Sequence, residues 1–268
     1  MSLINRLIIR VNENGLAGLF YQSAVVISFL AVLIFFEFYR RRFGLKRSEG
    51  IAALVIAYPL SYIWMLVLTW VQNGFRDFGD NNMVRLYIWV PLFILLAAKI
   101  LNRDARMLTD FFAPAAALVQ AIGHTTCVFP GCCHGYPCSW GIVNYPLSQE
   151  LWSEQLQKGG YVFTVPVQWL ECLVALGVFF AVKIYTEKTG FDGRGNAYPL
   201  FLILFGATRF ALEFLRDNEK LFWGISELAL HALSMVAVGV VWLLLCRKYP
   251  KKAVPNHVPE KHRKTKAA

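Results

Sequence analysis

Long apolar runs alternate with short polar or basic stretches along most of this sequence. Seven of these runs approach the roughly 20 residues that a helix needs to cross the hydrocarbon core of a bilayer. The seven runs are Gly18–Tyr39, Gly50–Val71, Met83–Leu101, Asp110–Val128, Phe163–Tyr185, Ala197–Leu215 and Gly224–Cys246. Because backbone groups in lipid must pair within the protein, the pattern predicts an all-α integral membrane protein with about seven transmembrane helices, some of them broken.

The fourth run is the least regular. It contains Pro114, Gln120, Gly123 and His124, and it opens at Asp110, which we interpret as a helix-start signal. The composition supports membrane insertion, since 57% of the residues are hydrophobic and only 16% are charged. Ordinary globular chains carry about 25% charged residues, and a soluble protein this apolar would expose large apolar patches, so the composition favours a membrane protein.

Basic residues lie in alternate connections, which predicts an outside N-terminus and a cytoplasmic C-terminus. The connections concerned follow the first, third and fifth runs and the last run, and they hold Arg40, Arg41, Arg42, Lys46, Arg47, Arg103, Arg106, Lys188, Arg194, Arg247 and Lys248. The net charge of +10 is therefore mostly a topology signal and does not indicate nucleic-acid binding. We predict one multi-pass domain over residues 1–249 in the cell membrane and a basic, disordered cytoplasmic tail over residues 250–268.

Three ionisable residues stand in the sixth run, where each is costly to bury and is a functional candidate by default. Arg209, Glu213 and Arg216 are four and three residues apart, so a helix places them on one face. A simple ion pair between Arg209 and Glu213 that holds helices in register is the alternative. Two arginines around one glutamate leave a positive surplus, and the planar guanidinium fork suits a phosphate-bearing lipid.

Other runs carry weaker polar candidates. Gln168 and Glu171 lie three residues apart at the start of the fifth run, where capping explains them as well as function does. Glu227 and His231 share a face of the seventh run, with a purely structural hydrogen bond as the equal alternative. Tyr21 lies near the outer end of the first run, a common place for tyrosine.

Four cysteines and two glycines mark the segment that follows the fourth run. The spacing of Cys127, Cys132, Cys133 and Cys138 does not match usual zinc sites, so no metal is predicted. A disulfide among them is compatible with an extracytoplasmic location, but its connectivity cannot be read from sequence. The irregular backbone around Gly131 and Gly135 predicts the wall of a pocket near the outer leaflet.

Taken in order, three motifs resemble the prolipoprotein diacylglyceryl transferase family. DFFAPAAALVQAIGHTTCVFPGCCHGYP is similar to its D-x-x-A-P … Q-A-x-G-R-x-G-x-F-x-x-G signature, VPVQWLE to its H-P-x-Q-x-Y-E, and GATRFALEFLR to its G-x-x-R-x-x-x-E-x-x-R. The resemblance covers roughly the C-terminal 140 residues, with a Gly-Cys-Cys-x-Gly form of the turn. Seven spans with the N-terminus outside also fit the family.

The resemblance implies a transfer reaction in the bacterial cell membrane. A diacylglyceryl group would pass from phosphatidylglycerol, or a similar anionic phospholipid, to the lipobox cysteine of a lipoprotein precursor, with no cofactor. Arg209 matches the family's essential arginine, and Gly135 matches its signature glycine. The resemblance also assigns substrate-binding positions at Gly131, Gln168, Glu171, Glu213 and Arg216, to which we add Tyr21.

Several positions depart from the family pattern. His124 replaces the signature arginine, Val165 replaces a histidine, and Cys127 and Cys132 stand where members carry asparagine and glutamate. The third run also lacks the family's His-Gly-Gly. We therefore predict that His124 or His134 takes the proton from the acceptor thiol, since a neutral imidazole suits that role near pH 7.

Two other functions fit the same residues. The first is a membrane thiol–disulfide protein that works through Cys127, Cys132, Cys133 and Cys138. The second is a catalytically inactive relative that binds lipid. Replacing the four cysteines by serine separates the first from a transferase, since transfer would persist.

Overall fold

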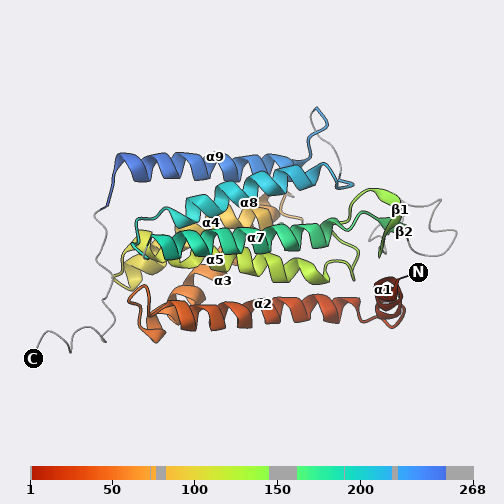
Figure 1. Cartoon of the computed structure of the whole chain (residues 1–268), viewed down its shortest axis with the longest axis horizontal. Helices are drawn as coiled ribbons and strands as arrows, with labels where there is room; N and C mark the ends of the chain where they lie inside the picture. Colours follow the sequence, from red (N-terminus) through yellow and green to blue (C-terminus); the bar gives the residue numbers. More distant parts are fainter. Residues whose placement is uncertain are drawn as a thin grey trace, which may run out of the picture. The chain divides into compact units, whose positions relative to one another are not determined.

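The computed structural model describes residues 2–72, 74–76, 83–144, 162–189, 191–218 and 223–251 (Figure 1). Its α-helices are α1 Leu3–Glu13, α2 Ala17–Tyr39, α3 Arg47–Gln72, α4 Met83–Ile100, α5 Ala105–Gly123, α7 Val167–Lys188, α8 Ala197–Glu213 and α9 Glu227–Lys248. A 3-10 turn follows α5 at His124–Thr126, and the described residues include the strands β1 Pro137–Asn144 and β2 Val162–Thr164. A helix covers most of each apolar run.

The chain is an integral membrane protein. Within the described residues, four helices are long and apolar enough to cross a bilayer: Ala17–Arg40, Arg47–Gln72, Val167–Lys188 and Glu227–Lys248. Large apolar side chains on these helices face outward. Water solvates such side chains poorly, whereas the lipid of a bilayer solvates them well. Val26 and Leu173, for example, are 58% and 66% exposed.

Two elements depart from an all-α architecture and were not predicted. Strands β1 and β2 pair antiparallel, with Val143 opposite Phe163, and an irregularity separates the pairs formed by Pro137 and Ile142. Because β2 takes the first residues of the fifth apolar run, α7 begins only at Val167. The tail predicted from residue 250 falls outside the described residues from 252 onward.

The described chain folds into two compact units. Unit 1 comprises Met1–Val32, Ala117–Val178 and Phe205–Leu233, and unit 2 comprises Leu33–Ala116, Phe179–Leu204 and Ser234–Ala268. Each unit is described by itself below.

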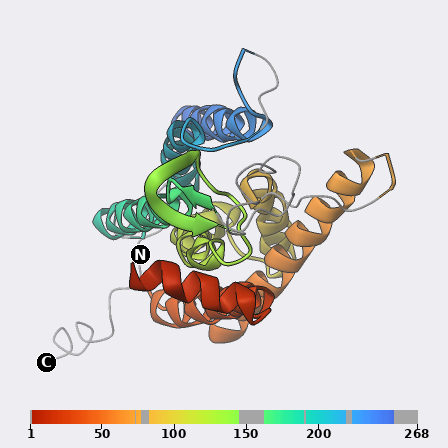
Figure 2. The same cartoon turned by 90° about the vertical axis from the view of Figure 1, so that its right-hand side faces the viewer.

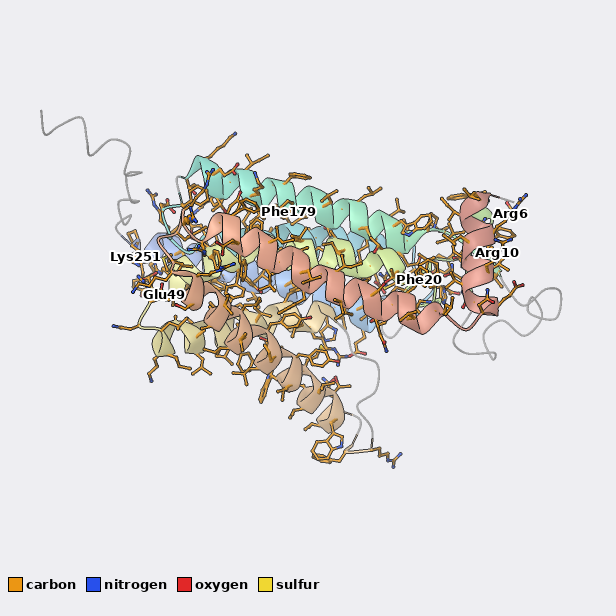
Figure 3. All side chains as sticks on the ribbon, turned by 90° about the horizontal axis from the view of Figure 1, so that it is seen from below. Arg6, Arg10, Phe20, Glu49, Phe179 and Lys251 are labelled. Carbon is orange, nitrogen blue, oxygen red and sulfur yellow. The ribbon has the colours of Figure 1, made fainter. Side chains whose placement is uncertain are left out.

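In unit 1, α1 packs against β1. Figure 1 places α1 and the two strands at the same end of this unit, and Figure 2 looks onto that end. Ser2 caps α1 by accepting a hydrogen bond from the backbone of Asn5 at 3.2 Å. Ile8 and Val11 are buried on its inner face, while Figure 3 shows the labelled Arg6 and Arg10 projecting from its outer side.

In unit 2, Asp110 does not have the helix-start role that the sequence predicts for it. Asp110 lies five residues inside α5 and does not start that helix. Its two carboxylate oxygens instead accept hydrogen bonds from the backbone of Gly195 and Ala197, each at 2.8 Å. The carboxylate therefore satisfies amides at the beginning of α8, a helix that is remote in sequence. No local pattern could reveal this partner.

Candidate functional site

Four charged side chains from two helices and the turn after them form a buried network in unit 1. Glu171 lies on α7, Arg209 and Glu213 lie on α8, and Arg216 follows the end of α8. None of the four is more than 2% exposed. Helical spacing brings Arg209 and Glu213 onto one face, as the sequence predicts, and Glu171 reaches the same place from α7.

Each guanidinium contacts both carboxylates. Nη1 of Arg209 hydrogen-bonds to Glu213, and its Nε lies 3.5 Å from Oε1 of Glu171. Nη2 of Arg216 hydrogen-bonds to Glu171, and its Nε lies 3.9 Å from Oε2 of Glu213. This arrangement corrects the expected positive surplus, because Glu171 supplies a second carboxylate. Two positive and two negative groups balance, as buried charges require.

Neutral side chains complete the coordination of the carboxylates. Nε2 of Gln120 donates to Oε1 of Glu171 at 2.7 Å. The hydroxyl of Ser226 donates to Oε1 of Glu213 at 2.6 Å, and the side-chain amide of Asn218 donates to the same oxygen. The carboxylates are thus held by neutral donors as well as by arginine, which fixes the positions of all four charges.

His124 lies at the edge of this network. Its Nε2 is 3.5 Å from Oε1 of Glu171, and its Nδ1 is buried without a hydrogen-bond partner in the described structure. A carboxylate accepts hydrogen bonds, so it favours the tautomer with a proton on Nε2. The lone pair on Nδ1 is then available to accept a proton.

The turn from Cys127 to Gly135 lies against the network. Gly131 and Cys133 have φ of +75° and +60°, and this left-handed backbone is strained for a cysteine. Gly135 pairs with Arg216 in an isolated antiparallel bridge, and the amide of Tyr136 donates to Leu215 O at 3.1 Å. The turn and the residue that carries one guanidinium are therefore joined through the backbone.

A side chain at Gly135 would collide with this bridge. A Cβ there would lie 2.7 Å from the carbonyl oxygen of Val165 and 2.8 Å from that of Leu215, and neither backbone atom can move cheaply. We expect Gly135→Ala to lower the free energy of unfolding by about 1–3 kcal/mol. Thermal unfolding in detergent would measure the change.

Gly177 on α7 is the matched control. Apart from its chain neighbours and its own helix backbone, no described atom lies within 4 Å of a Cβ at Gly177, so Gly177→Ala should be neutral or stabilising by up to about 1 kcal/mol. A Gly135→Ala variant as stable as Gly177→Ala would contradict the close approach of the turn.

Gln168 connects the turn to the sheet. Its Nε2 donates to the backbone oxygen of Cys132 at 2.9 Å and to Oδ1 of Asn144 at 3.2 Å. The side chain of Asn144 in turn donates to Thr164 on β2. The side chain of Gln168 is fully buried. Its hydrogen bond to Cys132 therefore holds the turn against the start of α7.

The thiols near this turn are free. Cys127, Cys132, Cys133 and Cys138 form no disulfide in the structure. Within the described residues, no group of three or more His, Cys, Asp or Glu side chains could hold a metal ion. Sγ of Cys132 lies 3.5 Å from the carbonyl oxygen of Cys127, so the turn folds back onto its own first residue.

Unit 1 also holds buried polar atoms that lack a hydrogen-bond partner in the described part of the chain. Buried polar groups in native proteins are nearly always paired, so each exception needs an explanation. The atoms are Nδ1 of His124, Oγ1 of Thr126, Oε1 of Gln168, Nε of Arg209 and Nε of Arg216. Their concentration around the turn and the network marks this region as a candidate binding site.

The remaining predicted residues lie less centrally. Nδ1 of His134 is 3.2 Å from the oxygen of Gly135, and it must carry the hydrogen because a carbonyl only accepts. Tyr21 lies on α2 with 42% of its surface exposed. Nδ1 of His231 faces the backbone oxygen of Glu227 at 2.8 Å in an exposed part of α9, which agrees with the structural interpretation of that pair.

Comparison with known proteins identifies the family. A family model described as prolipoprotein diacylglyceryl transferase matches residues 52–245, well over half of the chain. This chain belongs to the prolipoprotein diacylglyceryl transferase family. The resemblance noted from the three ordered motifs is thereby confirmed.

Individual members of the prolipoprotein diacylglyceryl transferase family are distant relatives. The phosphatidylglycerol–prolipoprotein diacylglyceryl transferase of Clostridium tetani is 22% identical over 214 residues, which cover 75% of this chain and 81% of that protein. The Clostridium kluyveri protein of the same name is 29% identical over 215 residues, or 74% of this chain and 80% of the relative. One from Dehalococcoides mccartyi is 29% identical over 153 residues, or 56% of this chain and 55% of the relative.

Sequence reasoning missed several residues of the site in this family member. Ser226 carries a helix-start signal, since its hydroxyl accepts the amide of Ala229 at 3.1 Å, but nothing local indicates its bond to Glu213. Asn144 is the last residue of β1, and Asn218 lies in the connection after α8; neither place gives a polar residue special meaning. Their roles depend on contacts that only the folded chain creates.

Proposed function

We propose that this chain transfers the diacylglyceryl group of phosphatidylglycerol, or of a similar anionic phospholipid, to a cysteine thiol of a lipoprotein precursor. Family membership supports the reaction class. The observation that carries the assignment to this site is the buried network in which the Nε–H groups of Arg209 and Arg216 find no hydrogen-bond acceptor among the residues that the structure describes. Each Nε lies 3.5–3.9 Å from a carboxylate oxygen of the network, and on our proposal these N–H groups turn to the oxygens of a phosphate diester when the lipid binds.

The chemistry follows from the atoms that must change partners. The acceptor thiol loses its proton, and the thiolate sulfur attacks the diacylglyceryl carbon bonded to the phosphate oxygen. That carbon–oxygen bond breaks, a carbon–sulfur bond forms, and glycerol phosphate leaves with the oxygen. Negative charge grows on the departing phosphate, so fixed guanidinium donors stabilise the transition state more than the ground state.

We assign the proton transfer to His124. Its Nε2 is oriented by Glu171 at 3.5 Å, and its Nδ1 is unpartnered in the described structure. This residue stands where the family has its signature arginine, so it adds a base to the site. His134 is the second candidate for the same role, because it lies in the turn beside Gly135.

Replacing each histidine separates these two candidates. We expect His124→Ala to lower the turnover number about 10²–10⁴-fold, the usual contribution of a positioned general base. His134→Ala should remain within a few-fold of the wild type. The measurement is transfer of radiolabelled diacylglyceryl from phosphatidylglycerol vesicles to a lipobox peptide. Unchanged transfer in both single variants and in the double variant would exclude both histidines.

The topology that serves this reaction has seven spans. We propose that α2, α3, α4, α5, α7, α8 and α9 all cross the bacterial cytoplasmic membrane, with the N-terminus outside and residues 250–268 as a cytoplasmic tail of one multi-pass domain. The distribution of basic residues supports this orientation. The turn from Cys127 to Gly135 would then lie at the outer leaflet, with phosphatidylglycerol and the precursor.

Complementation tests the proposed function as a whole. The chain is expressed in a bacterial strain depleted of its own diacylglyceryl transferase, and growth and lipoprotein modification are followed. Rescue by the wild type and loss of rescue by Arg209→Gln are the expected results. A membrane-inserted wild-type protein that neither rescues the strain nor transfers lipid in vesicles would favour an inactive lipid-binding relative.

A further inference from the structure

Two buried oxygen atoms near the turn take no part in the proposed reaction. Oγ1 of Thr126 and Oε1 of Gln168 are out of reach of solvent and have no hydrogen-bond partner among the described residues. The transfer chemistry uses Nδ1 of His124 and the two arginines, but neither of these oxygens. Because buried polar groups are nearly always paired, both oxygens require a ligand whose atoms complement them.

The orientation of the Gln168 amide is fixed by its neighbours. Its Nε2 lies 2.9 Å from the backbone oxygen of Cys132, which can only accept a hydrogen bond, so the amide cannot be turned over. The second N–H of the same nitrogen donates to Oδ1 of Asn144 at 3.2 Å. Oε1 therefore needs a donor, and bulk water supplies none because Gln168 is 0% exposed.

The hydroxyl of Thr126 is an addition of this chain to the family motif. In the signature Q-A-x-G-R-x-G, the second glycine corresponds to Thr126 of QAIGHTT, so a side chain stands here where the motif has none. The neighbouring Thr125 is exposed, and its hydroxyl donates to the backbone oxygen of Ile122 at 2.6 Å. Of these two adjacent hydroxyls, that of Thr126 is the one left for a ligand.

The two oxygens belong to segments that contact each other. Thr126 ends the 3-10 turn, and Gln168 lies in the first turn of α7. Nε1 of Trp169 donates to the backbone oxygen of Thr125 at 3.4 Å. The residue after Gln168 is therefore bonded to the residue before Thr126.

The same two segments border the proposed phosphate site. Nε2 of His124, the first residue of the 3-10 turn, lies 3.5 Å from Oε1 of Glu171 on α7. Glu171 in turn contacts Arg209 and Arg216. A lipid whose phosphate binds these arginines thus has its headgroup beside the turn and the start of α7.

The chemistry of the two oxygens selects the group that binds them. A phosphate oxygen cannot bond to Oε1 of Gln168, since both atoms are acceptors. A hydroxyl group donates to Oε1 and can also exchange a hydrogen bond with the Thr126 hydroxyl. An ammonium group donates as well, but a neutral amide and a neutral hydroxyl offer it no counter-charge, and the carboxylates of Glu171 and Glu213 already pair with arginine.

We propose that Thr126 and Gln168 bind the free hydroxyl groups of a glycerol headgroup whose phosphate occupies Arg209 and Arg216. This inference rests on the proposed function and extends it, because the hydroxyls and the phosphate belong to the same leaving group. The site then discriminates between phospholipids that carry the same charge on the same diester. A headgroup without hydroxyls leaves two buried oxygens unpaired, which a site built around hydrogen bonds penalises strongly.

Matched lipids test this discrimination without any variant. Dioctanoyl phosphatidylglycerol and dioctanoyl phosphatidylpropanol share their acyl chains, phosphate diester and charge, and differ in the headgroup hydroxyls. Displacement of a fluorescent phosphatidylglycerol from the full chain in detergent micelles gives the affinity of each. We expect phosphatidylglycerol to bind about tenfold more tightly. Equal affinities would mean that water fills the two positions, and would overturn the proposal, as would dioctanoyl phosphatidylethanolamine binding as tightly as phosphatidylglycerol.

Substitutions assign the effect to Thr126. Thr126→Val keeps the shape of the side chain and removes the hydroxyl, so the preference should fall about threefold or more. Thr126→Ser, which keeps the hydroxyl, and Thr125→Val, the matched control, should retain it. Thermal unfolding checks that each variant is folded, and Thr126→Ala replaces the valine variant if that one is not. An undiminished preference in a folded variant without the hydroxyl overturns the role of Thr126.

Transfer to a lipobox peptide separates this inference from the proposed function. The ratio of kcat/KM for the two lipids should show the same preference as the affinities, and should fall in the same variant. Transfer from both lipids at equal kcat/KM would overturn the headgroup recognition. A binding preference without transfer from either lipid would defeat the proposed function and leave the recognition of the hydroxyls standing.

Discussion

Glu171→Gln is expected to lower the free energy of unfolding by about 3–5 kcal/mol, the usual cost of breaking a buried ion pair by removing one partner. Glu171 is fully buried and contacts Arg209, Arg216 and His124. The glutamine keeps the shape of the side chain but leaves two buried guanidiniums with one carboxylate. Thermal or denaturant unfolding in detergent would measure the loss.

Glu187 on the same helix provides the control. Its side chain is 35% exposed, and its carboxylate accepts hydrogen bonds from Lys183 at 2.9 Å and Tyr39 at 2.8 Å. Because solvent screens such a pair, Glu187→Gln should cost no more than about 1 kcal/mol. If both variants lost the same free energy of unfolding, the buried network around Glu171 would not be a major source of the stability of unit 1.

Arg209→Lys is expected to lower the rate of diacylglyceryl transfer about 10²–10³-fold, the effect typical of removing one fixed donor from a developing negative charge. Lysine keeps the positive charge opposite Glu213 but loses the planar fork whose Nε faces Glu171. The fold should therefore survive while the reaction suffers. Initial rates in phosphatidylglycerol nanodiscs, measured beside thermal unfolding, separate the two effects.

Arg194 serves as the comparison for this arginine. It is 55% exposed in its side chain and pairs with Asp192 at 2.7 Å, outside unit 1. Arg194→Lys should transfer lipid at the wild-type rate. Should Arg209→Lys also retain that rate while remaining folded, the guanidinium would have no part in stabilising the departing phosphate.

Much of the helical architecture follows from local pattern. A long apolar run in lipid forms a helix, because a helix pairs all of its backbone groups within the segment. The positions of the helices can therefore be read from the sequence. The spacing of Arg209, Glu213 and Arg216 likewise places them together, since it depends only on the helical repeat. Helix α1 escaped prediction because its 11 residues are amphipathic and too short to resemble a span.

The partners of buried polar groups could not be predicted in the same way. Glu171 and Arg216 are 45 residues apart, and Gln168 and Asn144 are 24 apart. Their pairing depends on how α7, α8 and the β1–β2 pair come together, and the sequence carries no local signal for it. The predicted positive surplus at Arg209 and Arg216 was wrong for this reason, because the carboxylate that balances the charge lies on another helix.

Asn5 has a practical implication for handling the protein. Its side chain accepts the amide of Val143 at 3.1 Å and approaches the carbonyl oxygen of Gly141 at 3.5 Å. The side-chain amide of Asn5 thus pairs with backbone groups on the edge of β1. Without it, these groups could pair with a strand of another molecule. Trimming the first dozen residues would uncover that edge, so shortened versions should be prone to self-association even with every transmembrane helix intact.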